Sequence, residues 1–349
     1  MVGKIPLRPA LSCGRRAARP FVSLVTLVLA GSVALTACGG DDGAKSDAAP
    51  DAQNTAAGAT LQGQWPLTGL PARGDVPKHP VMVVKIDNTA SSRPQVGLSK
   101  ADLVTEELVE GGSTRLAVFY YSHVPGRVGP VRSMRASDIG IIKPADAALV
   151  ASGGAPQTVR RLKAAGVKVY SEGAPGYSRD SSRSAPYNLF MQLPTLAKTL
   201  SSSGRPDDYF SWGDQKQFPK GQRARGISAM FSGGHTTSWA YRKGGYVNLN
   251  SNAAGNDQFR PDTVLVLRVR VGDAGYKDPA GNPVPETKFT GTGQAMVFHD
   301  GSVVRATWAK RGLDAPVTLR TKSGELSLPP GRVWMELVPQ NGGNVVVKK

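Results

Sequence analysis

Cysteine is nearly absent from this sequence, whose 349 residues include two cysteines, Cys13 and Cys38. Both precede residue 39, so the remainder of the chain contains no thiol. The part that folds therefore has no disulfide, no cysteine nucleophile and no cysteine metal ligand. This absence excludes several classes of enzyme and the common structural zinc sites.

Histidine is also scarce. The sequence has four histidines, which stand singly at His79, His123, His235 and His299. Zinc ligands come at short, regular spacings, and none is found here. The Walker, Gly-x-Ser-x-Gly and His-Glu-x-x-His patterns are absent as well. We therefore expect no metal and no cofactor, and the sequence favours a protein that is not an enzyme without deciding the question.

Acidic residues are missing from positions 1–20, which carry several arginines and a lysine. The run that follows, Phe21–Ala37, is apolar and ends in small residues. A basic start, an apolar middle and a small-residue end are typical of a secretory signal. As a helix this run spans about 25 Å, less than the ~30 Å core of a bilayer, so a permanent transmembrane helix is the weaker interpretation.

The four residues Leu35-Thr36-Ala37-Cys38 resemble a bacterial lipobox. In proteins with this motif the cysteine thiol accepts diacylglycerol, and the cysteine becomes the mature N-terminus after cleavage. The resemblance implies that residues 1–37 are a signal peptide and that Cys38 carries the lipid anchor, with palmitate among its acyl chains. It places the chain on the extracytoplasmic face of the cell membrane.

Residues 38–64 have almost no side chains that can pack, because glycine, alanine, serine and aspartate dominate them. We expect a flexible tether there. The remaining body, residues 65–349, has a net charge of about +15, which attracts anionic headgroups or wall polymers. Export argues against nucleic acid as a partner. Scattered basic residues that only keep the protein soluble are the alternative explanation of this charge.

The body divides into two parts by its patterns, which predict an α+β protein. Residues 65–213 alternate strand-like and helical runs and are expected to form a mixed α/β layered domain. Their expected strands are 80–88, 101–112, 114–124 and 147–154, and their expected helices are 133–144, 156–166 and 188–200, the last interrupted at Pro194.

Residues 214–349 lack helix signals and are expected to form a β-rich domain, a sandwich or an open barrel. Residues 263–271 alternate apolar and polar side chains, with Arg268 and Arg270 opposite the apolar ones. The Asp300-Gly301 pair predicts a hairpin between two strands. Residues 331–338 are expected to be the final strand.

Long stretches of the body resemble the YerB-like bacterial lipoproteins, the group defined by domain of unknown function 3048. In the N-terminal half these are "RPQVGLSKADLVTEELVEGGSTR", "VGPVRSMR", "SGGAP" and "RDSSRSAPYNLF"; in the C-terminal half they are "GTGQAMVFHDGSVVRATWAK" and "SGELSLPPGRVWMELVP". The resemblance covers about residues 66–339. It implies a surface lipoprotein with two paired domains and no settled activity.

The sequence departs from that family at two places. Tyr187 stands where the family often has a histidine, which argues against a histidine-based mechanism at that point. The C-terminal domain commonly has a Tyr-x-Arg element, but here Asn248 follows Tyr246-Val247 in place of the arginine.

The motifs of the N-terminal half bring together many charged residues. Glu106, Glu107 and Glu110 lie on one expected strand, with Glu106 and Glu110 on the same face. Arginine side chains grip carboxylate or phosphate groups with two parallel hydrogen bonds. The residues expected to bind an anionic group are Arg115, Arg132, Ser133, Arg135, Gly153, Gly154, Arg179 and Arg183.

Two structural interpretations of these residues remain open. In the first, the arginines and Ser133 form an anion pocket against the turn at 153–156, next to a helix N-terminus. In the second, they pair with Glu106, Glu107, Glu110 and Asp180 in an internal ion-pair network. Ser133 is a weaker candidate for a nucleophile, since no base is evident near it.

Three functions follow from these observations. The first is a binding or accessory lipoprotein of the cell envelope, which recognises an anionic group on a wall polymer or an envelope protein. The alternative is a hydrolase or transferase acting on an envelope glycan or phosphodiester, with Glu106 or Glu110 as general acid or base. A third is a scaffold for membrane protein assemblies.

Overall fold

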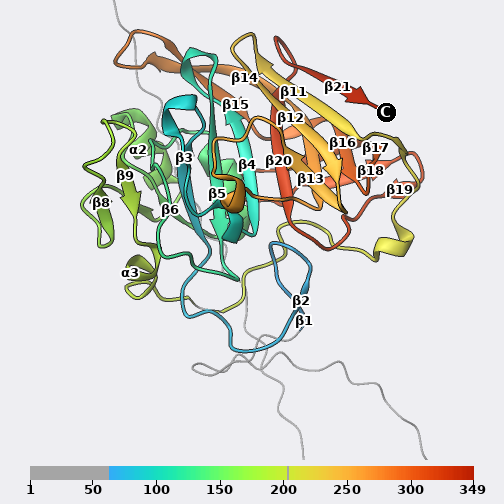
Figure 1. The fold of residues 1–349 in the computed structure, drawn as a ribbon, viewed down its shortest axis with the longest axis horizontal. Coiled ribbons are helices and arrows are strands. Elements are labelled where there is room, and N and C mark those ends of the chain that lie inside the picture. The colour runs from blue at the N-terminus through green and yellow to red at the C-terminus, as the bar shows by residue number, and fades with distance from the viewer. Residues whose placement is uncertain (1–62, 203) are drawn as a thin grey trace, which may run out of the picture. The chain divides into compact units, whose positions relative to one another are not determined.

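The computed structural model describes residues 63–202 and 204–349, which are drawn as coloured ribbons in Figure 1. The predicted signal peptide 1–37, the predicted lipidation at Cys38 and nearly all of the predicted tether lie outside these residues. The described residues belong to one compact unit of the chain.

A mixed sheet of 13 strands runs through the body. Its main path has the order β19-β18-β17-β16-β14-β20-β4-β5-β3-β6-β7, while β10 and β15 pair at its side. The strands from the N-terminal half are β3 (Met82–Asp87), β4 (Leu103–Leu108), β5 (Thr114–Tyr120), β6 (Ala148–Val150) and β7 (Val169–Tyr170). Those from the C-terminal half are β10 (Gln222–Arg223), β14 (Thr263–Lys277), β15 (Pro283–Lys288), β16 (Gly291–His299), β17 (Ser302–Lys310), β18 (Thr318–Thr321), β19 (Gly324–Glu325) and β20 (Val333–Pro339).

The two halves of the chain meet within this sheet, where β20 pairs in parallel with β4. The register sets Glu336 beside Glu106. β20 also pairs in parallel with β14 on its other side, so it lies between the two sets of strands. Strands from both sides of the predicted boundary at residue 213 are thus hydrogen-bonded neighbours, and that boundary stays a prediction.

A second sheet of four antiparallel strands has the order β13-β12-β11-β21. Its strands are β11 (Gly226–Ser232), β12 (His235–Arg242), β13 (Gly245–Asn248) and β21 (Asn344–Lys348). Two small hairpins complete the strands: β1 (Gly63–Gln64) with β2 (Pro71–Ala72), and β8 (Tyr177–Arg179) with β9 (Leu189–Met191).

The helices are short. They are α1 (Asp138–Ile142), α2 (Pro156–Ala164) and α3 (Leu193–Ala197), together with 3-10 turns at Ala90–Ser92, Leu98–Lys100, Glu110–Gly112, Lys143–Ala145, Gln215–Gln217 and Gly255–Asp257. None of the helices within the described residues is long and apolar enough to span a membrane.

Two hydrophobic cores lie on opposite faces of the large sheet. One face packs Val83, Phe119 and Leu265 with the apolar side chains of α1. The other packs Val264 and Phe298 against residues of the four-stranded sheet, among them Ile227, Ala229, Phe231, Trp239 and Tyr246. Because side chains alternate along a strand, the central strands β3, β4, β5, β14, β16, β17 and β20 each contribute to both cores.

The fold is mostly β, and the predicted α+β layering is confirmed in part. A large mixed sheet is present, and the helices of the N-terminal half are fewer and shorter than a layered α/β domain requires. Figure 1 shows α2 and α3 on the side of the N-terminal strands, away from the strands of the C-terminal half. In the C-terminal half the four-stranded sheet packs on the large one like a sandwich.

Several local predictions are confirmed. β14 alternates as expected, with Leu265, Leu267 and Val269 buried in one core. The Asp300-Gly301 pair joins β16 to β17, and both residues have positive φ, 45° and 66°, as a tight hairpin turn requires.

Three local predictions are wrong. The helix expected at 188–200 is instead strand β9 followed by α3, and Pro194 lies in the first turn of α3, where a missing N–H costs nothing. β20 is followed by a further strand, β21. Glu110 is not on the strand of Glu106, because β4 ends at Leu108 and Glu110 begins a 3-10 turn with the positive-φ Gly111.

Candidate functional site

The face of the large sheet that packs on α1 carries a buried group of charges. The alternation of β3, β4 and β5 directs Lys85, Asp87, Glu107 and Arg115 to the same side as Val83 and Phe119. All four charged residues are at most 5% exposed. Burial of this many charges requires close partners, because each is costly to remove from water.

Lys85 is the centre of the deepest contacts. Its Nζ lies 2.7 Å from Glu107 Oε1 and 2.6 Å from Asp138 Oδ1, and all three side chains are fully buried. Ser137 donates its hydroxyl to Glu107 Oε2 at 2.5 Å. Although burial opposes the charged form of Lys85, the two carboxylates outweigh it and raise the pKa of the lysine. Burial raises the pKa of Asp138 to about 6.

Three arginines lie beside this group and are called the arginine cluster: Arg115, Arg132 and Arg135. Glu110 joins two of them, since Arg115 Nη2 lies 2.9 Å from its Oε1 and Arg135 Nε donates to its Oε2 at 2.9 Å. Arg132 Nε lies 2.9 Å from Asp87 Oδ2. Glu110 and Asp87 are thus the carboxylates of the cluster.

The arginines of the cluster also affect one another and their carboxylates. Burial, together with the neighbouring charges of Arg135 and Arg132, lowers the pKa of Arg115 to about 10, against the opposing effect of Glu110 and Asp87. Burial of Glu110 is outweighed by Arg115 and Arg135, which lower its pKa. Together with the Lys85 group, four cations thus face four carboxyl groups: Lys85, Arg115, Arg132 and Arg135 against Asp87, Glu107, Glu110 and Asp138.

Arg132 is the outer member of the arginine cluster. Its side chain is 20% exposed, against 6% for Arg115 and 8% for Arg135. Among the described residues, the hydrogen bonds found do not involve the two Nη atoms of Arg132, while its guanidinium carbon lies 5.4 Å from the ring centre of Tyr187. One guanidinium therefore faces outward with donors available.

The chain around Arg132 is held by the neighbouring strand end. Ser152 donates its backbone N–H to Arg132 O at 3.0 Å, and Met134 donates to Gly153 O at 2.9 Å. Ser133 Oγ lies 3.4 Å from Ser152 Oγ. Gly153 has φ of 141°, and a Cβ there would meet nothing within 4 Å, so this turn borders open space. A Cβ at Gly154 would lie 2.8 Å from Met134 Cγ.

Arg179 and Arg183 make their contacts elsewhere. Arg179 pairs with Glu172 at 2.7 Å, and its side chain is 48% exposed. Arg183 donates to the carbonyl oxygens of Ser92, Arg93 and Pro94. The structure therefore brings together Arg115, Arg132 and Arg135 with Ser133 and the 153–154 turn, and it holds Arg179 and Arg183 in separate contacts.

Glu106 is on the opposite face of β4, where it joins the two sheets. Its side chain is fully buried, and it accepts hydrogen bonds from Asn88 and Thr114 of the N-terminal half, Thr237 of β12 and Trp334 of β20. His235 Nε2 lies 2.9 Å from Glu106 Oε1. The carboxylate has no opening to a cleft beside Arg132, because the two lie on different faces of the sheet.

A second buried carboxyl lies next to Glu106. Glu336 accepts a hydrogen bond from Trp239 Nε1 at 2.6 Å, and its other oxygen has no partner within the described residues. Burial, together with the charge of Glu106, raises the pKa of Glu336 well above its usual range. Burial therefore favours the protonated form of Glu336 beside Glu106.

His235 should make stability depend on pH. Burial lowers its pKa, but the hydrogen bond and charge of Glu106 outweigh burial and raise the pKa above 6.5. A raised pKa means that the imidazolium stabilises the fold below about pH 6.5, and that this stabilisation is lost as the pH rises through the folded pKa.

We expect His235→Gln to remove this dependence and to cost about 1 kcal/mol near pH 6 and much less at pH 9. Urea unfolding of both proteins at several pH values measures the difference. A difference in the free energy of unfolding that stays constant across this pH range would contradict the role given to the contact between His235 and Glu106.

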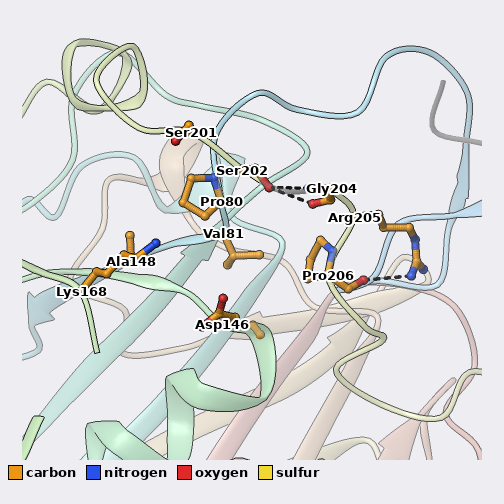
Figure 2. Close-up of a pocket in the computed structure, with 11 residues that line it drawn as sticks. Pro80, Val81, Asp146, Ala148, Lys168, Ser201, Ser202, Gly204, Arg205 and Pro206 are labelled. Carbon is orange, nitrogen blue, oxygen red and sulfur yellow. Dashed lines mark hydrogen bonds between the residues drawn. The ribbon is translucent and has the colours of Figure 1, made fainter. Parts of the chain in front are cut away.

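Two cavities are formed by other parts of the body. The first, of about 390 Å³, is lined by loops that include Lys168, Ser201 and Arg205, and Figure 2 shows these residues around it, with Arg205 donating to the carbonyl oxygen of Pro206. The second, of about 340 Å³, is lined by Trp65, Lys100 and Arg332 among others. The arginine cluster lines neither of them. Sequence patterns gave no signal for either cavity, since their residues come from loops far apart in the chain.

Within residues 63–202 and 204–349, no group of three or more histidine, cysteine, aspartate or glutamate side chains is placed to hold a metal ion. The polar interior instead consists of ion pairs and hydrogen bonds. The fold and its site thus define a mixed-sheet β protein with paired charges in its interior and one partly exposed guanidinium at their edge.

Two family profiles match this chain. They are described as the N-terminal and C-terminal domains of the DUF3048 proteins of unknown function, and they match residues 67–206 and 227–335. The chain belongs to the DUF3048 family. The resemblance of its motifs to the YerB-like lipoproteins is thereby confirmed.

Similar proteins support the same grouping. YerB of Bacillus subtilis (strain 168), a protein named as a candidate lipoprotein, is 25% identical over 288 residues, which cover 78% of this chain and 86% of YerB. The crystal structure of YerB from Bacillus subtilis has a TM-score of 0.67 at 21% identity and covers 81% of this chain and 99% of that one. The likeness of the two structures shows a shared fold.

Proposed function

We propose that this chain is a lipid-anchored binding or accessory protein of the cell envelope, which takes an anionic group at the arginine cluster. The proposed anchor is Cys38 in its lipobox, on the extracytoplasmic face of the membrane. The name of the relative YerB supports an envelope location. The basic charge of the body supports an anionic partner, such as a wall polymer or an acidic envelope protein.

The observation that carries the proposal is the position of Arg132 at the edge of the arginine cluster. Its side chain is the most exposed of the three, and its Nη atoms have no hydrogen bond within the described residues. A carboxylate or phosphate at this edge would accept two parallel hydrogen bonds from the Nη atoms. The hydroxyls of Ser133 and Ser152 stand beside it as further donors.

The geometry gives less support to the hydrolase or transferase alternative. Glu106 has its oxygens occupied by several donors and is fully buried. Glu110 is held by two arginines that lower its pKa, so it makes a poor general acid. Its ion pairs also leave little basicity for a general base. The anion-binding role needs neither carboxylate to react.

Arg132→Ala should weaken binding of an anionic wall polymer about tenfold or more, since hydrogen bonds to charged groups contribute about 1.5–3 kcal/mol. Arg179→Ala is the matched control, because it removes the same charge from a surface ion pair. The measurement is isothermal titration of each variant with purified anionic wall polymer, and unfolding curves check that both are folded. Equal losses in the two variants, or no loss in Arg132→Ala, would contradict the proposal.

A further inference from the structure

The second cavity lies at the start of the described body. Trp65 and Leu70 belong to the turn that joins β1 to β2, and they line the cavity together with Lys100, Asp102, His123 and Arg332. Leu70 is 39% exposed. Figure 1 shows β1 and β2 together at one end of the body.

The polar wall of the cavity is held by hydrogen bonds and includes two cations, Lys100 and Arg332. Asp102 is almost fully buried, and its carboxylate accepts the backbone N–H groups of Tyr121 and Ser122 at 2.7 and 2.9 Å. Arg332 donates to the carbonyl oxygens of Ser99 and Arg260, which fixes its guanidinium. Two cations thus face one carboxylate whose oxygens are already hydrogen-bonded.

Lys100 is the cation of this cavity that is free to meet a ligand. No ion pair to it is found within the described residues, and its side chain is exposed at the rim. His123 is also exposed, with Nδ1 2.8 Å from Ser122 Oγ. An anion entering the cavity would meet Lys100 and His123 first, with Arg332 behind them.

We propose that this cavity seats the phosphate headgroup of an anionic membrane lipid and holds this end of the body against the bilayer. The inference rests on the proposed anchor at Cys38. About 25 residues separate Cys38 from β1. The tether predicted there would span about 30 Å, which would keep the end of the body with this cavity within reach of the membrane.

The side chains around the cavity distinguish a lipid from a free phosphate. Trp65 lines the cavity half-buried against Tyr121, and the exposed Leu70 lies beside it. Tryptophan favours the boundary between headgroups and acyl chains, where this edge of the cavity would lie. Lysine and arginine residues near a membrane are attracted to anionic lipid by about 1 kcal/mol each. A free phosphate needs only the cations and gains nothing from the apolar rim.

The test uses the chain from residue 39 onward, which keeps all the described residues of the compact unit and lacks Cys38, the proposed site of the lipid. Cosedimentation with phosphatidylglycerol vesicles and with phosphatidylcholine vesicles measures partition. We expect binding to the first alone, and Lys100→Glu should reduce it by about tenfold or more. Lys163→Glu, an equal change of charge on the exposed side of α2, should reduce it less than about twofold.

Trp65 reports the site directly. Its fluorescence, taken as the difference between the parent protein and Trp65→Phe, should shift to shorter wavelength with phosphatidylglycerol vesicles and stay unchanged with inorganic phosphate. Equal losses of vesicle binding in Lys100→Glu and Lys163→Glu would show that the overall charge of the body causes the binding. That result would overturn the proposal. A response to inorganic phosphate without vesicle binding, or no vesicle binding at all, would overturn it as well.

The anchor is tested separately by labelling cells with radioactive palmitate and comparing Cys38→Ser. Loss of label in that variant supports the anchor without testing the cavity. Vesicle binding by the chain without its anchor supports the cavity without testing Cys38, so the failure of either proposal is recognised by itself.

Discussion

Lys85→Met lowers the free energy of unfolding by about 3–5 kcal/mol, because it leaves two buried carboxyl groups without their common cation. Lys85 Nζ contacts Glu107 and Asp138 at 2.7 and 2.6 Å, and none of the three side chains is exposed. Methionine is about as long as the apolar part of the lysine side chain, so the lost stability measures the removal of the positive charge. Urea unfolding at pH 7 measures it.

Two variants serve as controls for Lys85→Met. Arg161→Met removes an ion pair with Glu286 in which the arginine is 45% exposed, and it should cost about 1 kcal/mol or less. The triple variant Lys85→Met, Glu107→Gln and Asp138→Asn neutralises the whole group and should recover most of the loss. A triple variant as unstable as Lys85→Met would show that the unpaired charges do not cause the lost stability.

The effect of Lys85→Met also depends on pH. Burial raises the pKa of Asp138 to about 6. A raised carboxyl pKa means that the protonated form fits the fold, so its contribution is present at low pH and is lost as the pH rises through the folded pKa. Without Lys85, protonation is the remaining way to neutralise the carboxyls, and the loss should be smaller at pH 5 than at pH 8.

The alternation of side chains between the two faces of a strand could be predicted from the sequence. β3 and β5 lie where apolar runs indicated strands, and Glu106 and Glu107 face opposite sides of β4, as a period of two requires. The hairpin at Asp300-Gly301 could also be predicted, because its turn depends on two adjacent residues. These features depend on residues close together in the chain, so the sequence contains all the information needed to place them.

The partners of the charged residues could not be predicted in the same way. His235 contacts Glu106 from 129 positions away, and this contact exists because β12 packs over β4. The parallel pairing of β20 with β4 sets Glu336 beside Glu106, although nothing local in either strand selects the other. The tertiary fold, through strand pairing and sheet packing, determines which of many apolar strands become neighbours.

Glu106→Ala should lower the free energy of unfolding by about 3–5 kcal/mol, whereas Glu336→Gln should change it by less than about 1 kcal/mol at pH 5. Removal of the Glu106 carboxylate leaves the donors of Thr237, Trp334 and Asn88 buried without an acceptor. Glutamine at 336 keeps an oxygen for Trp239 Nε1 and matches the neutral form of the native side chain.

The two neighbouring carboxyls should also differ in their response to pH. Burial and the charge of Glu106 raise the pKa of Glu336, so its contribution to stability is complete below about pH 4.5 and is lost as the pH rises through the folded pKa. Glu336→Gln lacks this loss and should become the more stable protein at high pH, by at most about 1.4 kcal/mol for each pH unit. Unfolding curves from pH 5 to pH 9 measure the crossing. A Glu336→Gln variant less stable at every pH would mean that Glu336 is ionised in the fold, and Glu106 would then lose its place as the carboxylate that joins the two sheets.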